Sequence, residues 1–134
     1  MVDQAQNICN ISDIPVICDG DTGYGNPVNI KRTVHGYIRA GAAGIMIEDQ
    51  VSPKSCGHTK GKDVVDRETA IKRIKAAIEA RNEARNNDED IVIMARTDAR
   101  ATIGLDEALF RAEIFLNLGA DIIFVEAPRS KKEM

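Results

Sequence analysis

A cysteine stands between a lysine and a histidine in residues 54–58 (Lys-Ser-Cys-Gly-His) of this 134-residue chain. A thiol reacts as its thiolate, and neighbouring positive charges lower the pKa of the thiol. Lys54 and His58 are such neighbours of Cys56, and Gly57 lets the loop bend. We therefore predict that Cys56 is catalytic, with Lys54 and His58 as supporting catalytic residues. The alternative is an incidental cysteine beside a surface lysine and a solvated histidine.

A second group of reactive side chains consists of carboxylates. Asp19 and Asp21 are separated by one glycine, and Glu48 ends the next apolar run. Magnesium prefers oxygen ligands and keeps several waters, so a few carboxylates suffice to hold it. We predict a Mg²⁺ site at Asp19, Asp21 and Glu48, with Mn²⁺ as an alternative ion. A glycine-rich turn with helix-capping acids is the competing interpretation, and the glycine spacing does not fit a dinucleotide-binding loop.

An arginine and a glutamate, Arg96 and Glu126, follow two later apolar runs. A guanidinium can hold a carboxylate through two parallel hydrogen bonds, so we predict that Arg96 binds a substrate carboxylate. A salt bridge from Arg96 to Asp98 or Glu126 is the alternative, and both can hold at once. Glu126 either contacts the ligand or orients Arg96.

Four apolar runs alternate with helical patterns. The runs are residues 15–18, 44–47, 91–94 and 122–125. Asn26 and Asp66 can cap helices that follow them, a third helix starts near Leu105, and Gly41 and Gly119 end two of them. In the third helix the residues expected to face inward are Leu109, Ala112, Phe115 and Leu116. Continuously apolar strands that alternate with helices predict a parallel α/β sheet covered by helices, with the first run as a buried strand. Residues 1–11 are expected to form a further helix.

The reactive residues all come directly after a predicted strand. In parallel α/β folds, active sites form at the carboxyl ends of the strands. The connection formed by residues 49–65 is long, because connections of this kind usually have about two to six residues. Long ordered loops at this edge commonly act as lids, so we predict a lid that carries Cys56.

Composition narrows the class of protein. The chain is 43% hydrophobic and 29% charged with a net charge of −3, as in a globular protein without a basic nucleic-acid surface. No apolar run approaches the roughly 20 residues of a membrane helix, and no signal peptide pattern is present. Three scattered cysteines fit a reducing compartment. We expect a cytoplasmic protein with a small carboxylate partner; an organellar location of a longer parent stays open.

Several motifs together resemble the isocitrate lyase and phosphoenolpyruvate mutase superfamily. They are residues 19–26 (Asp-Gly-Asp-Thr-Gly-Tyr-Gly-Asn), 47–50 (Ile-Glu-Asp-Gln), 54–58, 95–99 (Ala-Arg-Thr-Asp-Ala), 104–108 and 124–128. The methylisocitrate lyase-like branch, whose members are often called carboxyphosphonoenolpyruvate phosphonomutases, is the most similar. The resemblance runs nearly from end to end.

The resemblance implies a (β/α)8 TIM-type barrel with magnesium at the carboxyl ends of its strands. Asp19 would bind the metal directly, and Asp21 and Glu48 through water. The substrate-binding residues would be Arg96, Glu126 and Gly57. Residues 54–58 would form the gating loop, with Cys56 as the acid/base residue.

We expect this chain to hold only the middle of such a barrel, because a complete one needs about 250 residues and the chain has four predicted strands. We expect residues 1–134 to be a single partial barrel domain, a fragment of a longer catalytic domain whose parent is a homotetramer. Four strands without closure leave two sheet edges and an uncovered apolar face.

The implied function is a Mg²⁺-dependent carbon–carbon lyase. It would cleave a 2-hydroxy di- or tricarboxylate, similar to 2-methylisocitrate or dimethylmalate, to a 2-oxo acid and a second carboxylate. Phosphonomutases of the superfamily lack a cysteine in this loop, so Cys56 favours lysis. The alternatives are a phosphonomutase or an oxaloacetate hydrolase on the same scaffold, and a non-catalytic remnant that serves as a binding or assembly module.

Overall fold

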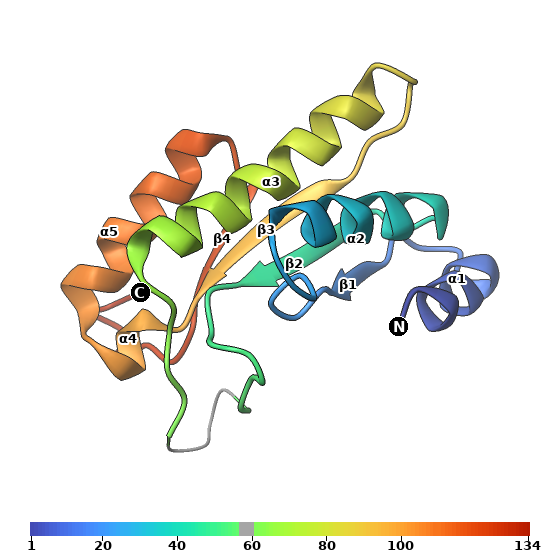
Figure 1. Ribbon diagram of the computed structural model, residues 1–134. Helices are drawn as coiled ribbons and strands as arrows, with labels where there is room; N and C mark the ends of the chain where they lie inside the picture. The colour runs from blue at the N-terminus through green and yellow to red at the C-terminus, as the bar shows by residue number, and fades with distance from the viewer. Residues whose placement is uncertain (57–60) are drawn as a thin grey trace.

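Four parallel strands form the sheet at the centre of the protein (Figure 1). The computed structural model describes residues 1–56 and 61–134. The strands lie side by side in chain order and are β1 (Ile17–Asp19), β2 (Gly44–Glu48), β3 (Val92–Thr97) and β4 (Ile122–Val125). Each strand overlaps one of the predicted apolar runs, so the predicted parallel α/β sheet is confirmed.

Helices connect the strands in turn. They are α1 (Val2–Ile11), α2 (Pro27–Arg39), α3 (Arg67–Arg85), the short α4 (Ala99–Thr102) and α5 (Leu105–Leu118). Helix α3 packs between α2 and α5, and these three helices cover one face of the sheet (Figure 1). The alternation of parallel strands and covering helices is that of part of a TIM-type barrel. In the part of the chain that the structure describes, no helix combines the length and apolarity needed to cross a bilayer.

The predicted helix ends are confirmed by their hydrogen bonds. The Asn26 side chain accepts from the first backbone N–H groups of α2, and Pro27 is the first helical residue. The Asp66 side chain accepts from the Thr69 N–H at 2.9 Å and caps α3. Gly119 follows α5 with φ 106°, a left-handed conformation that favours glycine.

The inward face of α5 differs from the prediction. Phe115 is fully buried as expected, whereas Leu109 is 50% exposed and Leu116 is 58% exposed. The residues that α5 buries are Ala108, Arg111 and Phe115. The reason is an ion pair: the Arg111 guanidinium donates to the buried Asp49 carboxylate at 3.0 Å. Because this pair fixes the rotation of the helix, the two leucines turn toward solvent.

The outer strands carry the uncovered apolar face that four strands without closure predict, whereas the prediction that the first strand is buried was wrong. Ile17 of β1 is 50% exposed, and Ile122 and Phe124 of β4 are 38% and 41% exposed. In contrast, Ile45 and Ile93 of the central strands are fully buried beneath the helices. Alternate side chains of a strand point to opposite faces, and helices α2, α3 and α5 cover only one of them. The expected uncovered apolar face is therefore present on the other side of the sheet.

Candidate active site

The carboxyl ends of the four strands bring the predicted site residues together. Asp19 and Glu48 are the last residues of β1 and β2, and Glu126 comes directly after β4. Glu48 is in register with Arg96 of β3. The Arg96 guanidinium lies 3.4 Å from a carboxylate oxygen of Glu48 and 3.4 Å from one of Glu126. The parallel register thus forms a charged cluster from residues far apart in the sequence.

The Lys54 ammonium lies among the three predicted metal ligands. It donates to Asp19 at 2.9 Å, forms an ion pair with Asp21, and lies 3.9 Å from Glu48. Burial lowers the pKa of Lys54, but the hydrogen bonds that its ammonium donates to Asp21 and Asp19 outweigh burial and raise that pKa. The three carboxylates therefore converge on one position that holds a positive charge.

Glu48 is the least solvated member of this group. Only 1% of the residue is exposed, and neither carboxylate oxygen has a hydrogen-bond partner among the described residues. Burial raises the pKa of Glu48 to about 7, although the charges of Lys54 and Arg96 oppose the shift. A buried carboxylate without hydrogen bonds is costly and needs a cation or a proton beside it.

The donor set at this position fits magnesium. Asp19, Asp21 and Glu48 offer hard oxygen donors, the Lys54 ammonium marks the place of a cation, and both oxygens of Glu48 lack hydrogen-bond donors among the described residues. Within residues 1–56 and 61–134, however, no group of three or more His, Cys, Asp or Glu side chains is placed so that these side chains alone could hold a metal ion. This spacing suits Mg²⁺ because that ion retains waters between itself and some ligands.

The loop after β1 is held in shape by its own contacts. The Asp21 N–H donates to the Asp19 carboxylate at 2.8 Å, and the Tyr24 hydroxyl donates to the Asp21 carboxylate at 2.6 Å. Burial raises the pKa of Asp21, but the hydrogen bonds that its carboxylate accepts from Lys54 and Tyr24 outweigh burial and lower that pKa. A Cβ on Gly20 would come within 2.7 Å of the Ile47 side chain, so a glycine is required there. Sequence reasoning did not find the contribution of Tyr24.

Arg96 makes the internal ion pairs that the sequence offered as its alternative role. Its Nε and Nη2 donate to the two oxygens of Asp98 at 2.9 and 3.0 Å. Lys62 also donates to Asp98 at 2.9 Å, and both side chains of that pair are almost fully buried. These bonds keep the pKa of Asp98 below its ordinary value despite burial. Lys62 was missed because nothing in the sequence separates it from the other lysines of the loop.

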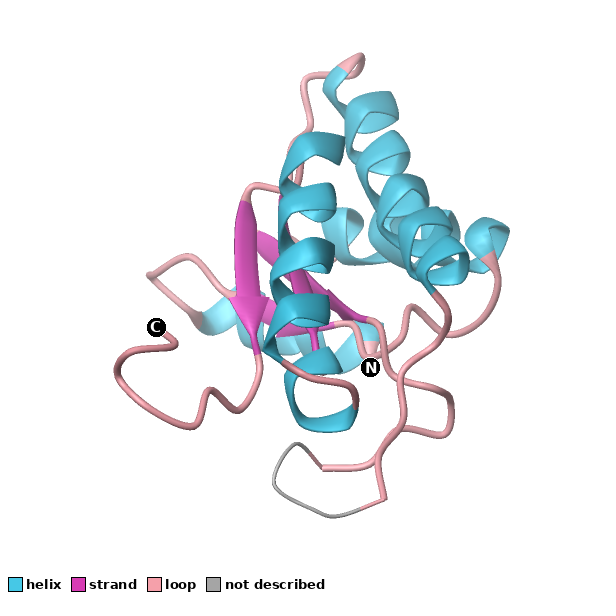
Figure 2. Cartoon of the chain, turned by 90° about the vertical axis from the view of Figure 1, so that its left-hand side faces the viewer, coloured by secondary structure: helices cyan, strands magenta, loops and turns pink. Residues whose placement is uncertain are grey.

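The connection from β2 to α3, here called the cysteine loop, begins and ends in two segments, its two limbs, that are joined by backbone hydrogen bonds. The Val51 N–H donates to the Asp63 carbonyl, and the Val65 N–H donates to the Asp49 carbonyl, both at 2.9 Å. The Gln50 side chain accepts from the Ser55 N–H at 3.1 Å. Figure 2 shows the limbs of this loop running out past the ends of the strands.

Cys56 lies on the outgoing limb and its side chain is exposed. The ammonium of Lys54, two residues earlier, is bonded to Asp19 and Asp21. Gly57 and His58, the other predicted residues of this loop, lie outside the described residues. The catalytic assignment of Cys56 and His58 thus stays a prediction.

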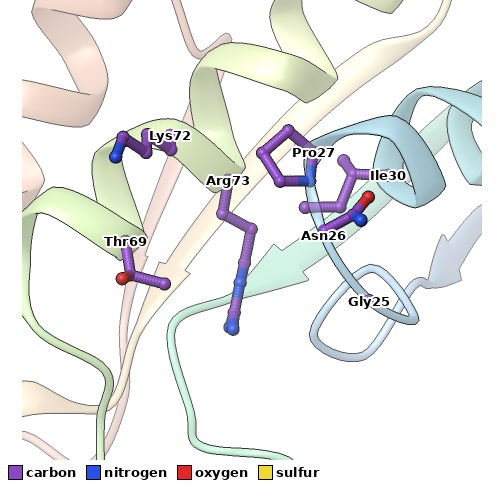
Figure 3. Close-up of a pocket in the computed structure, with 7 residues that line it drawn as sticks. All are labelled: Gly25, Asn26, Pro27, Ile30, Thr69, Lys72 and Arg73. Atoms are coloured by element: carbon purple, nitrogen blue, oxygen red, sulfur yellow. The ribbon is translucent and has the colours of Figure 1, made fainter.

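A pocket between the first turns of α2 and α3 is separate from the charged cluster. Pro27, Thr69 and Lys72 line it, and Arg73 extends from α3 along its wall (Figure 3). Nη1 of Arg73 donates to the backbone carbonyls of Glu48 and Gln50 at 2.7 and 2.9 Å. Arg73 therefore fixes the backbone where β2 passes into the cysteine loop.

The chain is similar in sequence to enzymes that act on carboxylates and phosphonates. The phosphoenolpyruvate phosphomutase family model matches residues 1–134. The 2,3-dimethylmalate lyase of Eubacterium barkeri is 49% identical over 134 residues, which are all of this chain and 45% of that protein. The 2-methylisocitrate lyase of Aeropyrum pernix is 48% identical over 94% of this chain and 39% of its own length. The chain spans less than half the length of these relatives.

Solved structures agree with the sequence matches. A crystal structure of 2,3-dimethylmalate lyase, described as a PEP mutase/isocitrate lyase superfamily member, superposes with a TM-score of 0.93 at 44% identity, over 98% of this chain and 43% of that one. Oxaloacetate acetylhydrolase bound to 3,3-difluorooxalacetate also gives 0.93, at 42% identity over 99% and 44%. Phosphonopyruvate hydrolase in complex with oxalate and Mg²⁺ gives 0.79, at 34% identity over 96% and 42%. The chain therefore belongs to the phosphoenolpyruvate phosphomutase family, within the PEP mutase/isocitrate lyase superfamily.

Proposed function

We propose that the full-length protein is a Mg²⁺-dependent carbon–carbon lyase. Its substrate is a 2-hydroxy di- or tricarboxylate similar to 2-methylisocitrate or 2,3-dimethylmalate, and its products are a 2-oxo acid and a second carboxylate. The observation that carries the proposal is the convergence of Asp19, Asp21 and Glu48 on one cation position next to Arg96. Relatives named as lyases of these two substrates support it.

In this proposal Asp19, Asp21 and Glu48 would hold the metal. Bound Mg²⁺ supplies a Lewis acid that draws electron density from the oxygens of the substrate. A structural relative that contains oxalate and Mg²⁺ supports this choice of ion, and Mn²⁺ suits the same oxygen donors.

Arg96 and Glu126 bind and orient the substrate. The guanidinium holds a carboxylate with charge-assisted hydrogen bonds, and Glu126, 3.4 Å away, keeps it facing the cluster. Because Asp98 already occupies Nε and one position on Nη2, the substrate carboxylate approaches from the other side of the guanidinium. Gly57, which is outside the described residues, is the third proposed substrate-binding residue.

Cys56 acts as the general acid of the lyase reaction. The substrate hydroxyl gives its proton to a general base and becomes the carbonyl of the 2-oxo acid as the carbon–carbon bond breaks. The electron pair of that bond stays on the carbon next to the carboxylate of the second product, and the Cys56 S–H supplies the proton that this carbon takes up. His58 and Lys54 act with Cys56 from the same loop. Water must be excluded at this step, which is the function of the loop once substrate is bound.

Oxaloacetate hydrolysis is the second candidate function. It is favoured by the close similarity to oxaloacetate acetylhydrolase, whose TM-score equals that of the dimethylmalate lyase. A phosphonomutase reaction, the third possibility on the same scaffold, is less suited to a loop that presents a thiol.

A substrate panel separates these functions. The full-length protein is incubated with 2-methylisocitrate, 2,3-dimethylmalate, oxaloacetate, phosphonopyruvate and phosphoenolpyruvate, with Mg²⁺ and after its removal by a chelator. We expect release of a 2-oxo acid from one of the two 2-hydroxy acids, loss of this activity with the chelator and its return with added Mg²⁺. Oxalate from oxaloacetate alone, or a reaction of either phosphorus compound alone, would contradict the proposal.

A further inference from the structure

Asp49, the residue after Glu48, is a buried carboxylate with three donors around it. It is only 1% exposed. Its Oδ1 accepts from the backbone N–H of Asp98 at 2.9 Å, and its Oδ2 accepts from the Thr97 hydroxyl at 2.7 Å. The Arg111 guanidinium completes the set at 3.0 Å. Asp49 thereby holds in place the two residues that directly follow Arg96, which are Thr97 and Asp98.

The contacts of Asp49 continue to the Arg96 guanidinium. Asp49 fixes the backbone of Thr97 and Asp98, and the fully buried Asp98 side chain then accepts two hydrogen bonds from Arg96. With Nε and Nη2 held, the plane of the guanidinium is set relative to Glu48 and the metal position. A shift of the Thr97–Asp98 turn would rotate the Arg96 guanidinium, which binds the substrate carboxylate in the proposed function.

The opposite side of Asp49 is anchored in the helices. Arg111 of α5 also donates to Glu107 at 2.8 Å, and Glu107 accepts from Arg67 at the start of α3. The charge of Asp49 is thus balanced by Arg111 without contact with a ligand. The anchor is rigid because Arg111 is 3% exposed and pinned at two points.

We propose that Asp49 is a positioning residue that aligns Arg96 for the substrate carboxylate. This inference rests on the proposed function, in which Arg96 binds that carboxylate. Asp49 itself touches neither substrate nor metal; it acts through the Thr97–Asp98 turn. The competing explanation is that Asp49 only stabilises the fold through its pair with Arg111.

A matched control lies at the opposite end of the same sheet. The Asp121 carboxylate accepts from Arg81 of α3 at 2.5 Å and from the backbone N–H of Ile93 at 2.8 Å. It therefore combines an arginine and a strand N–H as Asp49 does, but before β4 rather than after β2. Asp121→Asn removes the charge of a carboxylate with the same two kinds of donor but with 32% of its side chain exposed, against 1% for Asp49, and it leaves the turn behind Arg96 unchanged.

The test measures oxalate binding by calorimetry and the KM of the cleaved substrate, with the full-length protein saturated with Mg²⁺. We expect Asp49→Asn to weaken oxalate binding and to raise KM about tenfold or more, because lost alignment of a charged pair costs at least ~1.4 kcal/mol. Asp121→Asn should change both quantities less than about twofold. In an Arg96→Met background, Asp49→Asn should have no further effect on oxalate binding, since both changes act on one interaction.

The outcomes separate the inference from the function on which it rests. Two results would overturn the inference in a wild type that binds oxalate and cleaves its substrate. One is that Asp49→Asn changes oxalate affinity and KM no more than Asp121→Asn does. The other is that Asp49→Asn still weakens oxalate binding in the Arg96→Met background. A wild type that neither binds oxalate nor cleaves the panel overturns the proposed function as well. If Asp49→Asn does not fold, Thr97→Val removes one Asp49 contact with little change in shape, and unchanged oxalate affinity in that variant would overturn the inference.

Discussion

Lys54 and a divalent cation favour the same position among carboxylates. The ammonium contacts Asp19 and Asp21 and approaches Glu48. A metal ion that binds there must displace it, so Lys54 competes with the metal and opposes it by charge. Because Lys54 belongs to the cysteine loop, this competition connects the loop to the occupancy of the metal position.

We predict that Lys54→Met binds Mg²⁺ about tenfold more tightly than the wild type, since the competing charge is removed. Calorimetric titration of the metal-free full-length protein measures the affinity. Lys72→Met is the control, because Lys72 pairs with Glu68 on the outer surface of α3. Equal Mg²⁺ affinities for the wild type and Lys54→Met would contradict the overlap of the two positions.

Glu48 should make the stability of the metal-free protein depend on pH. Its folded-state pKa is raised to about 7, above its ordinary value of 4.5. Between pH 4.5 and about pH 7, Glu48 is protonated in the folded protein and ionised in the unfolded chain. The free energy of unfolding therefore falls as pH rises through this range. We predict that Glu48→Gln loses this dependence and is more stable than the wild type at pH 8.

Urea unfolding of both metal-free proteins at pH 5 and pH 8 measures the difference. The advantage of Glu48→Gln over the wild type should shrink toward pH 5, where Glu48 is protonated in the folded state. A difference between the two proteins that is the same at both pH values would show that burial does not control the ionisation of Glu48.

Residue types and order were sufficient to predict which charges gather, but not all of their pairings. Asp19, Glu48, Arg96 and Glu126 could be found because each follows an apolar run, and parallel strands end at one edge. Asp49 could be placed at this edge in the same way, but its pair with Arg111 could not be predicted, and Lys62 was missed. Buried and exposed charges have the same letters in a sequence, and only packing tells them apart.

At the scale of elements, the rotation of α5 was the main error of prediction. Apolar spacing placed both Leu109 and Leu116 inward, yet Arg111 occupies that face. Hydrophobic periodicity assumes that charged residues face water, and the Asp49–Arg111 pair breaks that assumption. The caps at Asn26 and Asp66 were predictable because their hydrogen bonds are local.

We predict that Phe115→Ala lowers the free energy of unfolding by about 3–5 kcal/mol, because it leaves a cavity under the helix. Leu116→Ala should cost less than ~1 kcal/mol, since its side chain is 58% exposed. Urea denaturation of the full-length protein compares the two. A larger loss for Leu116→Ala would mean that this face of α5 is covered in the full-length protein.

At the scale of the whole molecule, one face of the sheet carries exposed apolar residues. Ile17, Ile122 and Phe124 extend across it, and β1 and β4 are edge strands. Such surfaces favour association or cover by further chain. The chain matches only 45% of the dimethylmalate lyase relative, so the remaining length of that protein is unmatched here.

We predict that residues 1–134, produced alone, self-associate or bind a hydrophobic dye and show no lyase activity. Size-exclusion chromatography, circular dichroism and the activity assay measure these properties, with the full-length protein as the control. A cooperative, monomeric, Mg²⁺-dependent lyase made of these residues alone would show that the open face needs no cover. A stable, folded but inactive chain would instead favour a binding or assembly role.

The most direct test of the proposed chemistry is a single substitution, Cys56→Ser, in the full-length protein. We expect carbon–carbon cleavage of the 2-hydroxy acid substrate to fall by about 10²-fold or more, as for loss of a general acid. Binding of Mg²⁺ and oxalate should remain as in the wild type, because Asp19, Asp21, Glu48 and Arg96 are untouched. Cleavage at the wild-type rate by Cys56→Ser would contradict the role of the thiol as the proton donor.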